Sequence, residues 1–282
     1  MWQSLGLPGL IDLHVHFMPR NVMDKVWAYF DGVGPLTGQP WPIAYREDEQ
    51  RRLDRLRAMG VLAFPSLIYP HKPGMARWLN SWAADFAGRH PDVLHTATFF
   101  PEPDAGEYVE QALAAGARIF KAHVQVGGYD PRDPLLDPVW SLLADASVPV
   151  VVHCGHGPMP GSFTGASIFA EVLRRHPALV PVIAHMGLPD YGEFLQLAQQ
   201  HERVHLDTTM AFTRWSEQAA PFPRDLSQLL VTVGDRIVLG SDFPNIPYAY
   251  VEQLAGLVRL ELGDDWLRGV LHRNAAVLLG LS

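Results

Sequence analysis

This chain of 282 residues has almost no cysteine, no long hydrophobic run and no excess of basic residues. Its single cysteine, Cys154, excludes an intramolecular disulfide framework and suits a reducing compartment. The net charge of −8 argues against a protein that follows nucleic-acid phosphates, which normally presents a basic face. No apolar run approaches the ~18–20 residues of a membrane helix, and the start, MWQSLGLPGL, lacks the basic region of a signal peptide. We therefore expect a cytoplasmic protein that binds neither nucleic acid nor membranes.

What the sequence does contain is a regular alternation of strand and helix patterns. Apolar residues make up 48% of the chain and charged residues 18%, which is typical of a globular protein. Helical patterns occupy 75–90, 106–117, 137–147, 166–176 and 192–201. Short apolar, β-branched runs predict eight strands, at 10–17, 61–69, 94–100, 118–125, 148–153, 179–185, 203–210 and 236–242. Strands separated by helices of this length indicate right-handed βαβ units in a parallel sheet.

Eight such units without a compositional break predict one domain over residues 1–282, folded as a closed (β/α)8 barrel of the TIM type. An open doubly wound sheet is the competing fold, and it normally carries a glycine-rich turn after its first strand. The chain has DLHVHF at that place. The segment 17–60 is long and rich in Trp, Tyr, Pro and Gly, so we expect an insertion after strand 1 that either covers the binding site or only packs on the surface.

Histidine and aspartate residues gather at the predicted ends of strands. The carboxyl ends of barrel strands meet at one mouth, where active sites form, so these side chains are expected to converge. They are His14, His16, His123, His153, His185 and Asp242.

The spacing within this group indicates a metal site. His14 and His16 are two residues apart and so point to the same side of a strand, where both rings can bind one ion. His153 can supply a third nitrogen and Asp242 an oxygen, a set that suits Zn²⁺ although other divalent ions accept it. In a purely structural interpretation His153 and His185 are core residues and Asp242 is a helix cap. That interpretation leaves imidazole nitrogens in need of partners within apolar runs.

At these residues the chain resembles the amidohydrolase superfamily, and most of all the amidohydrolase-related (family 2) branch that contains aminocarboxymuconate-semialdehyde decarboxylase and 2-pyrone-4,6-dicarboxylate lactonase. The matching segments run from residue 11 to the end of the chain: IDLHVHF, IFKAHVQVGGYDP, VPVVVHCGHGP, VPVIAHMG, LGSDFP and HRNAAVLLGL. The resemblance implies a distorted barrel, a homodimer, and one divalent metal ion, with Zn²⁺ as the expected ion. It makes His14, His16, His153 and Asp242 the metal ligands and His185 a catalytic residue.

Four further residues are candidates for binding a small-molecule substrate. Lys121, in strand four, is expected to face the substrate; in binuclear relatives a lysine there is carboxylated and bridges two metals, and a simple salt bridge is the third alternative. His123 and His156 could contact the substrate or be structural. Arg214 follows strand seven and could bind a substrate carboxylate through two hydrogen bonds.

Metal-assisted hydrolysis is the first expectation for the reaction. Asp242 would accept a proton from a metal-activated water, and His185 would stabilise the oxyanion that forms on a small carboxylated lactone or ring compound. The alternative is a non-oxidative decarboxylation that uses the same ligands. The net negative charge argues against a phosphodiesterase. The presence of all five metal-site and catalytic residues together argues against a barrel that has lost catalysis.

Overall fold

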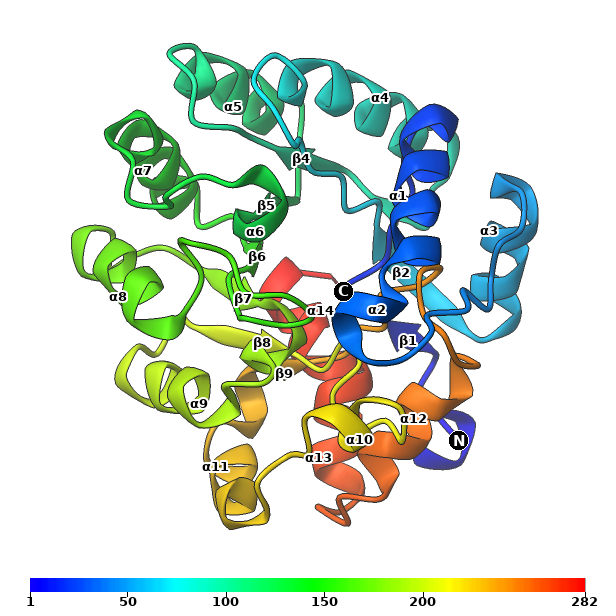
Figure 1. The fold of residues 1–282 in the computed structure, drawn as a ribbon. Helices are drawn as coiled ribbons and strands as arrows, with labels where there is room; N and C mark the ends of the chain where they lie inside the picture. The colour runs from blue at the N-terminus through cyan, green and yellow to red at the C-terminus, as the bar shows by residue number, and fades with distance from the viewer. Residues whose placement is uncertain (282) are drawn as a thin grey trace.

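The protein is described by a computed structural model that covers residues 1–281, in which short parallel strands stand inside a ring of helices (Figure 1). Hydrogen-bonded neighbours follow the orders β1-β2-β3 and β4-β5-β6-β7-β8-β9. Only His95 separates β3 from β4, so these two form a single barrel position and the strands fill the eight predicted positions. Their bounds are β1 Leu10–Ile11, β2 Val61–Pro65, β3 Val93–Leu94, β4 Thr96–Thr98, β5 Ile119–His123, β6 Val150–His153, β7 Pro181–Ile183, β8 His205–Asp207 and β9 Ile237–Val238.

Backbone hydrogen bonds join the first strand to the last and complete the ring. Leu13 N donates to Leu239 O at 2.8 Å, and Asp242 N donates to His14 O at 2.8 Å. His16 N donates to Phe243 O at 2.7 Å. The predicted α/β barrel is therefore confirmed. The seam of the barrel runs between the segments that follow β1 and β9.

The strands are shorter than the apolar runs that predict them, because the backbone turns at their carboxyl ends. His185, Met186, Met210 and Asp242 have φ values between 53° and 71°, in the left-handed region that breaks a strand ladder. His185, Met210 and Asp242 are the last residues of three of the apolar runs, and all three line the mouth of the barrel.

Helices surround the strands, and the five helical patterns of the sequence coincide with α4, α5, α7, α8 and α9 within three residues at each end. None of the helices in residues 1–281 is long and apolar enough to cross a membrane. The bounds are α1 Arg20–Gly32, α2 Gly34–Thr37, α3 Glu49–Ala58, α4 Ala76–Arg89, α5 Ala105–Ala114, α6 Val124–Gly127, α7 Asp137–Ala146, α8 Ala166–Arg175, α9 Tyr191–Gln200, α10 Ser216–Ala219, α11 Ser227–Thr232, α12 Val251–Val258, α13 Asp264–Arg268 and α14 Asn274–Leu279.

The barrel interior has an apolar half and a polar half. In β5, Ile119 and Lys121 lie on the same side because strand side chains alternate with a period of two. Ile119 belongs to a buried apolar cluster with Val151, Val182 and residues of α14, which lies across the amino end of the strands, whereas Lys121 is buried nearer the mouth. All the polar chemistry therefore lies at the carboxyl end of the strands.

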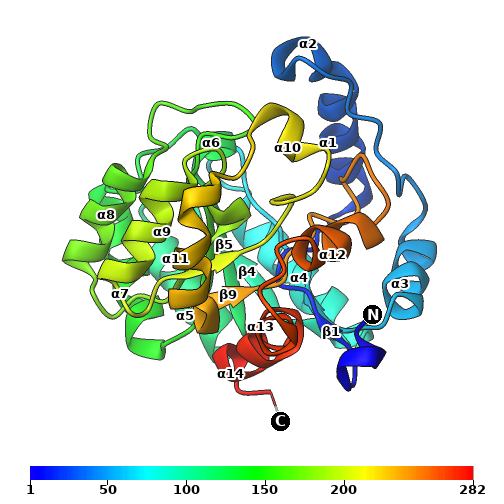
Figure 2. The ribbon, with the colours of Figure 1, turned by 90° about the horizontal axis from the view of Figure 1, so that it is seen from below.

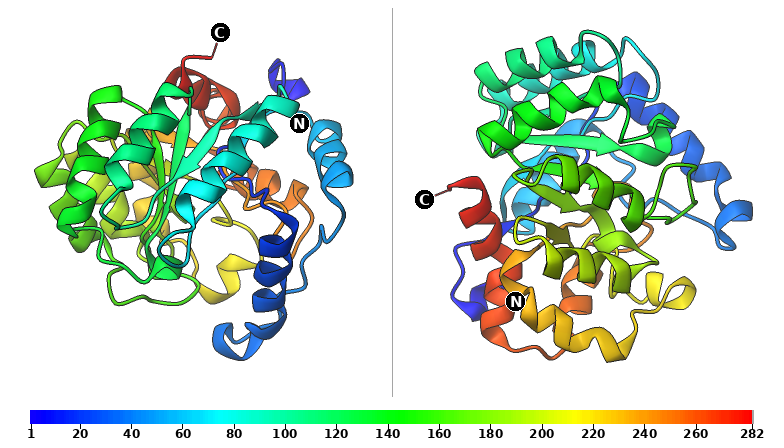
Figure 3. Two further views of the ribbon diagram at one scale, coloured as in Figure 1. Left: turned by 90° about the horizontal axis from the view of Figure 1, so that it is seen from above. Right: turned by 90° about the vertical axis from the view of Figure 1, so that its left-hand side faces the viewer.

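The segment 17–60 contains three helices, of which α1 and α2 project beyond the carboxyl ends of the strands (Figures 2 and 3). We call residues 20–41 the cap. Two tryptophan side chains fasten it to the loop that follows β9: Trp27 Nε1 donates to Asn245 Oδ1 at 3.1 Å, and Trp41 Nε1 donates to Asn245 O at 2.7 Å. The cap is thus tied to the loop that carries Asp242.

A substitution at Gly187 tests whether the turn after β7 requires a glycine. Its φ is +74°, and an added Cβ would lie 1.9 Å from Cδ2 of Phe194. Because overpacking and a left-handed backbone both cost free energy, we expect Gly187→Ala to lower the unfolding free energy by about 3 kcal/mol or more. Gly88→Ala is the matched control, since Gly88 is helical with open space around it and should be neutral or slightly stabilising. Equal melting temperatures for the two variants would contradict this account.

Candidate active site

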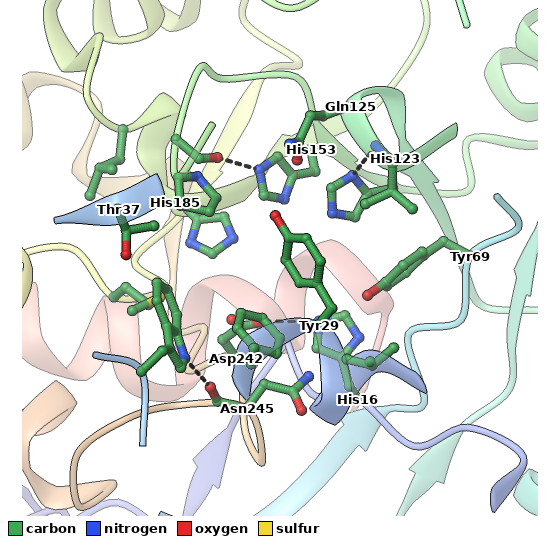
Figure 4. Close-up of a pocket in the computed structure, with 18 of the residues that line it drawn as sticks. His16, Tyr29, Thr37, Tyr69, His123, Gln125, His153, His185, Asp242 and Asn245 are labelled. Atoms are coloured by element: carbon green, nitrogen blue, oxygen red, sulfur yellow. Dashed lines mark hydrogen bonds and ion pairs between the residues drawn. The ribbon is translucent and has the colours of Figure 1, made fainter. Parts of the chain in front are cut away.

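His14, His16 and Asp242 meet at the mouth of the barrel (Figure 4), each offering a ligand atom within 4.8 Å of the others. His16 Nε2 lies 2.9 Å from Asp242 Oδ1, and His14 Nε2 lies 3.6 Å from the same oxygen. Val15, between the two histidines, pairs with Phe243 across the seam. The seam hydrogen bonds therefore bring the three side chains together.

A hydrogen bond at Nδ1, on the side of each ring away from Asp242, fixes the orientation and the tautomer of His14 and His16. His14 Nδ1 lies 2.8 Å from the buried carboxylate of Asp207, and His16 Nδ1 lies 2.7 Å from the carbonyl oxygen of Leu67. Both partners only accept hydrogen bonds, so each Nδ1 carries the proton. Each Nε2 is then left with a lone pair directed toward Asp242.

This arrangement fits a metal ion. Two imidazole lone pairs and a carboxylate converge on one point, and without a positive charge between them they would repel. Nitrogen and oxygen donors of this kind are the ligands that Zn²⁺ and other divalent ions take, and a carboxylate behind a ligating histidine is the usual second contact in such sites.

The protonation states also suit metal ligation. Burial, together with the charge of Lys121, lowers the pKa of His14 well below its usual value, so its ring is neutral. Burial of Asp242 favours its protonated form, but the neighbouring rings of His16 and His14 outweigh it and lower its pKa. Asp242 is thus a carboxylate at neutral pH.

Three more histidines form the opposite side of the site. The rings of His123 and His153 are stacked with centroids 4.1 Å apart, and the His153 ring is 4.7 Å from that of His185. His153 Nε2 lies 2.8 Å from Gly157 O, and His153 is not in the 4.8 Å group of His14, His16 and Asp242. The structure therefore brings three of the four predicted ligands together and leaves the fourth beside His185.

His185 lies between the two groups. Its ring centroid is 5.0 Å from that of His14, and its backbone N donates to Asp207 Oδ1 at 2.9 Å. Burial and the neighbouring ring of His14 lower its pKa to about 4, so the ring is neutral near pH 7. No side-chain hydrogen bond engages the ring within residues 1–281, which leaves both nitrogens for a substrate.

The structure places the other candidates differently. His123 and His156 line the cavity, and His156 Nδ1 pairs with Asp190 Oδ2 at 2.5 Å. Lys121 does not line it; the side chain is fully buried, with Nζ 3.4 Å from His14 Nε2, and burial lowers its pKa to about 8. Arg214 is exposed outside the cavity. Neither Lys121 nor Arg214, the two cations among the substrate-binding candidates, lines the cavity.

Three residues of the site are not among the sequence candidates. Asp207 ends β8, so the strand-end rule that identifies His153 at the end of β6 could have found it. Asp12 accepts from His14 N and from the hydroxyl of Tyr250, and burial raises its pKa to about 7. Tyr69 packs its ring against His16 and His123, and an aromatic residue in an apolar run gives no signal of such a role.

One cavity of about 1090 Å³ lies over this site, and its floor is lined by His14, His16, Tyr69, His123, His153, His185 and Asp242. Asp242 is the only carboxylate among the described residues that line it, whereas Lys25 and Lys72 lie higher on its walls. The site therefore attracts anions except at one point on its floor.

The histidines predict how stability depends on pH. The pKa values of His14, His123 and His153 are lowered well below 6.5, and that of His185 to about 4, in each case chiefly by burial. Below pH ~6.5 the unfolded chain takes up protons that the folded chain does not, so stability falls as the pH falls. Asp12, with its raised pKa of about 7, acts in the opposite direction, but it is one group against four.

We therefore expect metal-free protein to melt at a lower temperature at pH 5.5 than at pH 7.5. Differential scanning calorimetry measures this directly. An equal or higher melting temperature at pH 5.5 would contradict the neutral, buried state of these rings.

Comparisons with known proteins find the same fold in solved structures. The chain is similar to an uncharacterized TIM-barrel protein of Bordetella bronchiseptica, with 20% identity, a TM-score of 0.77, and 96% and 98% of the two chains covered. A 2,6-dihydroxybenzoate decarboxylase from Rhizobium has 18% identity and a TM-score of 0.67, covering 98% and 99%. A 5-carboxyvanillate decarboxylase from Novosphingobium aromaticivorans, solved with manganese and a nitrobenzoic acid, has 14% identity and a TM-score of 0.64, covering 98% and 97%.

No curated protein matches the chain. The solved structures establish the fold. The sequence model described as "Amidohydrolase" matches residues 11–281, nearly the whole chain and every element of the barrel. This protein belongs to the amidohydrolase family.

Proposed function

We propose that this protein is a divalent-metal-dependent decarboxylase that acts on a hydroxylated ring carboxylate. The observation that carries the proposal is the meeting of two oriented imidazoles and one carboxylate, those of His14, His16 and Asp242, on the floor of a cavity that no other acid among residues 1–281 lines. The decarboxylases among the structures of the same fold favour this reaction over the hydrolysis that was the first expectation. Both reactions are compatible with the family.

In this proposal His14, His16 and Asp242 hold the ion, and His153 completes the set as a fourth ligand once its bond to Gly157 opens. The bound ion supplies a positive charge that holds the oxygens of the substrate. Zinc and manganese both accept this mixed nitrogen and oxygen donor set, so the donors do not decide between them. The manganese in the similar decarboxylase makes that ion the first to test.

The residues around the ion then act on the ring. Decarboxylation breaks the bond between the ring carbon and the carboxyl carbon, and the electron pair stays on the ring carbon, which must take up a proton. His185, with both ring nitrogens free, and Asp242 are the groups on the floor that can hold and transfer that proton. Tyr69 presents a hydroxyl beside His16 and His123, where it can orient a substrate oxygen.

The walls suit the substrate proposed. A ring carboxylate is an anion with a flat apolar body, and the cavity offers lysines at its rim and apolar side chains below them. The carboxylate exchanges water for contacts with the cavity as it binds, whereas the departing CO2 is neutral and needs no such solvation.

The orientation of His14 can be tested through Asp207. In Asp207→Asn the amide oxygen can still accept from the backbone N of His185 and Thr209, but the amide NH2 then faces His14 Nδ1. His14 must turn to the tautomer that carries its proton on Nε2, which cannot ligate. We expect metal affinity to fall by about 10–100-fold, measured by competition titration with Mn²⁺ or Zn²⁺.

His14→Ala should lose the ion altogether, and His201→Ala, at the end of α9 far from the mouth, should bind it as the natural protein does. Unchanged affinity in both Asp207→Asn and His14→Ala would remove these residues from the metal site. Circular dichroism verifies that each variant is folded.

The reaction can be tested with 2,6-dihydroxybenzoate and with a pyrone lactone carboxylate on manganese-loaded protein. We expect CO2 from the benzoate, loss of activity on chelation, recovery on adding manganese, and a fall of at least about 10²-fold in Asp242→Asn. Hydrolysis of the lactone without CO2 from any ring carboxylate would instead support the hydrolase.

A further inference from the structure

Above the catalytic floor the same cavity widens into a chamber that the floor chemistry does not explain. The chamber is bounded by one face of α1, by the tryptophans Trp41 and Trp215, and by the start of α4. A single-ring carboxylate is much smaller than a cavity of about 1090 Å³, which lies at the upper limit for sites that hold drug-sized ligands.

Helix α1 presents two different apolar faces. Met23 and Trp27 are buried and anchor the helix to the barrel. Val22, Val26 and Tyr29, spaced by four and three residues, form a second stripe that lines the cavity. Figure 4 shows Tyr29 projecting from α1 into the cavity above the floor. Val22 and Val26 are half-buried against the cluster that contains Met23 and Trp27, whereas Tyr29 is exposed.

A connected set of aromatic rings, which begins on α1 with Phe30, forms another part of the wall. The ring centroids of Phe30 and Trp41 are 5.0 Å apart, and those of Trp41 and Trp215 are 4.4 Å apart in an edge contact. These contacts join the cap to the segment before α10, which also projects beyond the strands (Figure 2). The chamber is thus walled by packed rings.

Four large apolar side chains that are exposed in the described part of the chain lie together in this chamber. Tyr29 and Trp78, exposed by 49% and 44%, are the two large aromatic side chains that residues 1–281 leave exposed, and both line the cavity. Leu36 and Val126 are also exposed there. Exposed apolar surface gathered in a concave site indicates a ligand that covers it.

We propose that this chamber binds an apolar extension of the substrate, so that the natural substrate is a ring carboxylate that carries an aryl or comparably large alkyl group. The inference rests on the proposed function, because it takes the His14–His16–Asp242 floor as the place of reaction. A protein segment seated in the chamber would close the route to that floor, whereas a substrate extension uses it.

The test compares 2-hydroxybenzoate with 2-hydroxybiphenyl-3-carboxylate, which differ by one phenyl ring. Calorimetric titration of manganese-loaded protein should show the biphenyl compound binding at least about tenfold more tightly. Tyr29→Ala and Leu36→Ala should each reduce that ratio by about threefold or more. Leu135→Ala is the matched control, since Leu135 is an exposed leucine outside the cavity, and should keep the full ratio.

Equal affinities for the two compounds would overturn the inference, as would a preference that survives in both cap variants or falls equally in Leu135→Ala. The inference would also be overturned if the natural protein shows no phenyl preference and forms a dimer that dissociates in Leu36→Asp. That result would mean that a second copy of the chain covers the chamber. The proposed function fails separately, through absence of CO2 release. A phenyl preference without CO2 would keep the chamber and reject the decarboxylase.

Discussion

The site depends on two hydrogen bonds that lie behind the metal-facing atoms. Asp207 and the carbonyl of Leu67 each take the Nδ1 proton of a histidine, and this leaves the Nε2 lone pairs of His14 and His16 aimed at Asp242. Because both acceptors are buried and cannot donate, the tautomers are not free to change. The donor set is therefore oriented before any ion or substrate arrives.

The same residues close the barrel. Asp242 N donates to His14 O, and His16 N donates to Phe243 O, so the backbone at the seam and the side chains at the mouth belong to the same few residues. The hydrogen bonds that close the barrel therefore also bring the side chains of His14, His16 and Asp242 together. Asp242 takes a left-handed φ of 71° at this place, and Asn245 N donates to its carbonyl at 2.8 Å.

Asn245 extends this coupling to the cap. It accepts from Trp27 and Trp41, so the apolar chamber is tied to the loop that carries Asp242. A catalytic floor that is rich in nitrogen donors and a chamber lined by aromatic rings are thus built on one frame. In the function we propose, this division would let the fixed floor perform one reaction while the cap selects the substrate.

The sequence by itself determined the barrel, the order of its strands and most of the polar residues at its mouth, because the period of a strand and the position of strand ends are local properties. The place of His14, His16 and Asp242 followed from those local properties. The tertiary structure decided the rest. In it His153 hydrogen-bonds to Gly157, Lys121 is buried next to His14, and Arg214 lies outside the cavity. The tertiary structure also places Asp207 and Asp12 in contact with His14, and it joins the cap to the loop that carries Asp242. Those outcomes depend on how side chains from distant strands and loops pack against one another, which spacing along one chain does not specify.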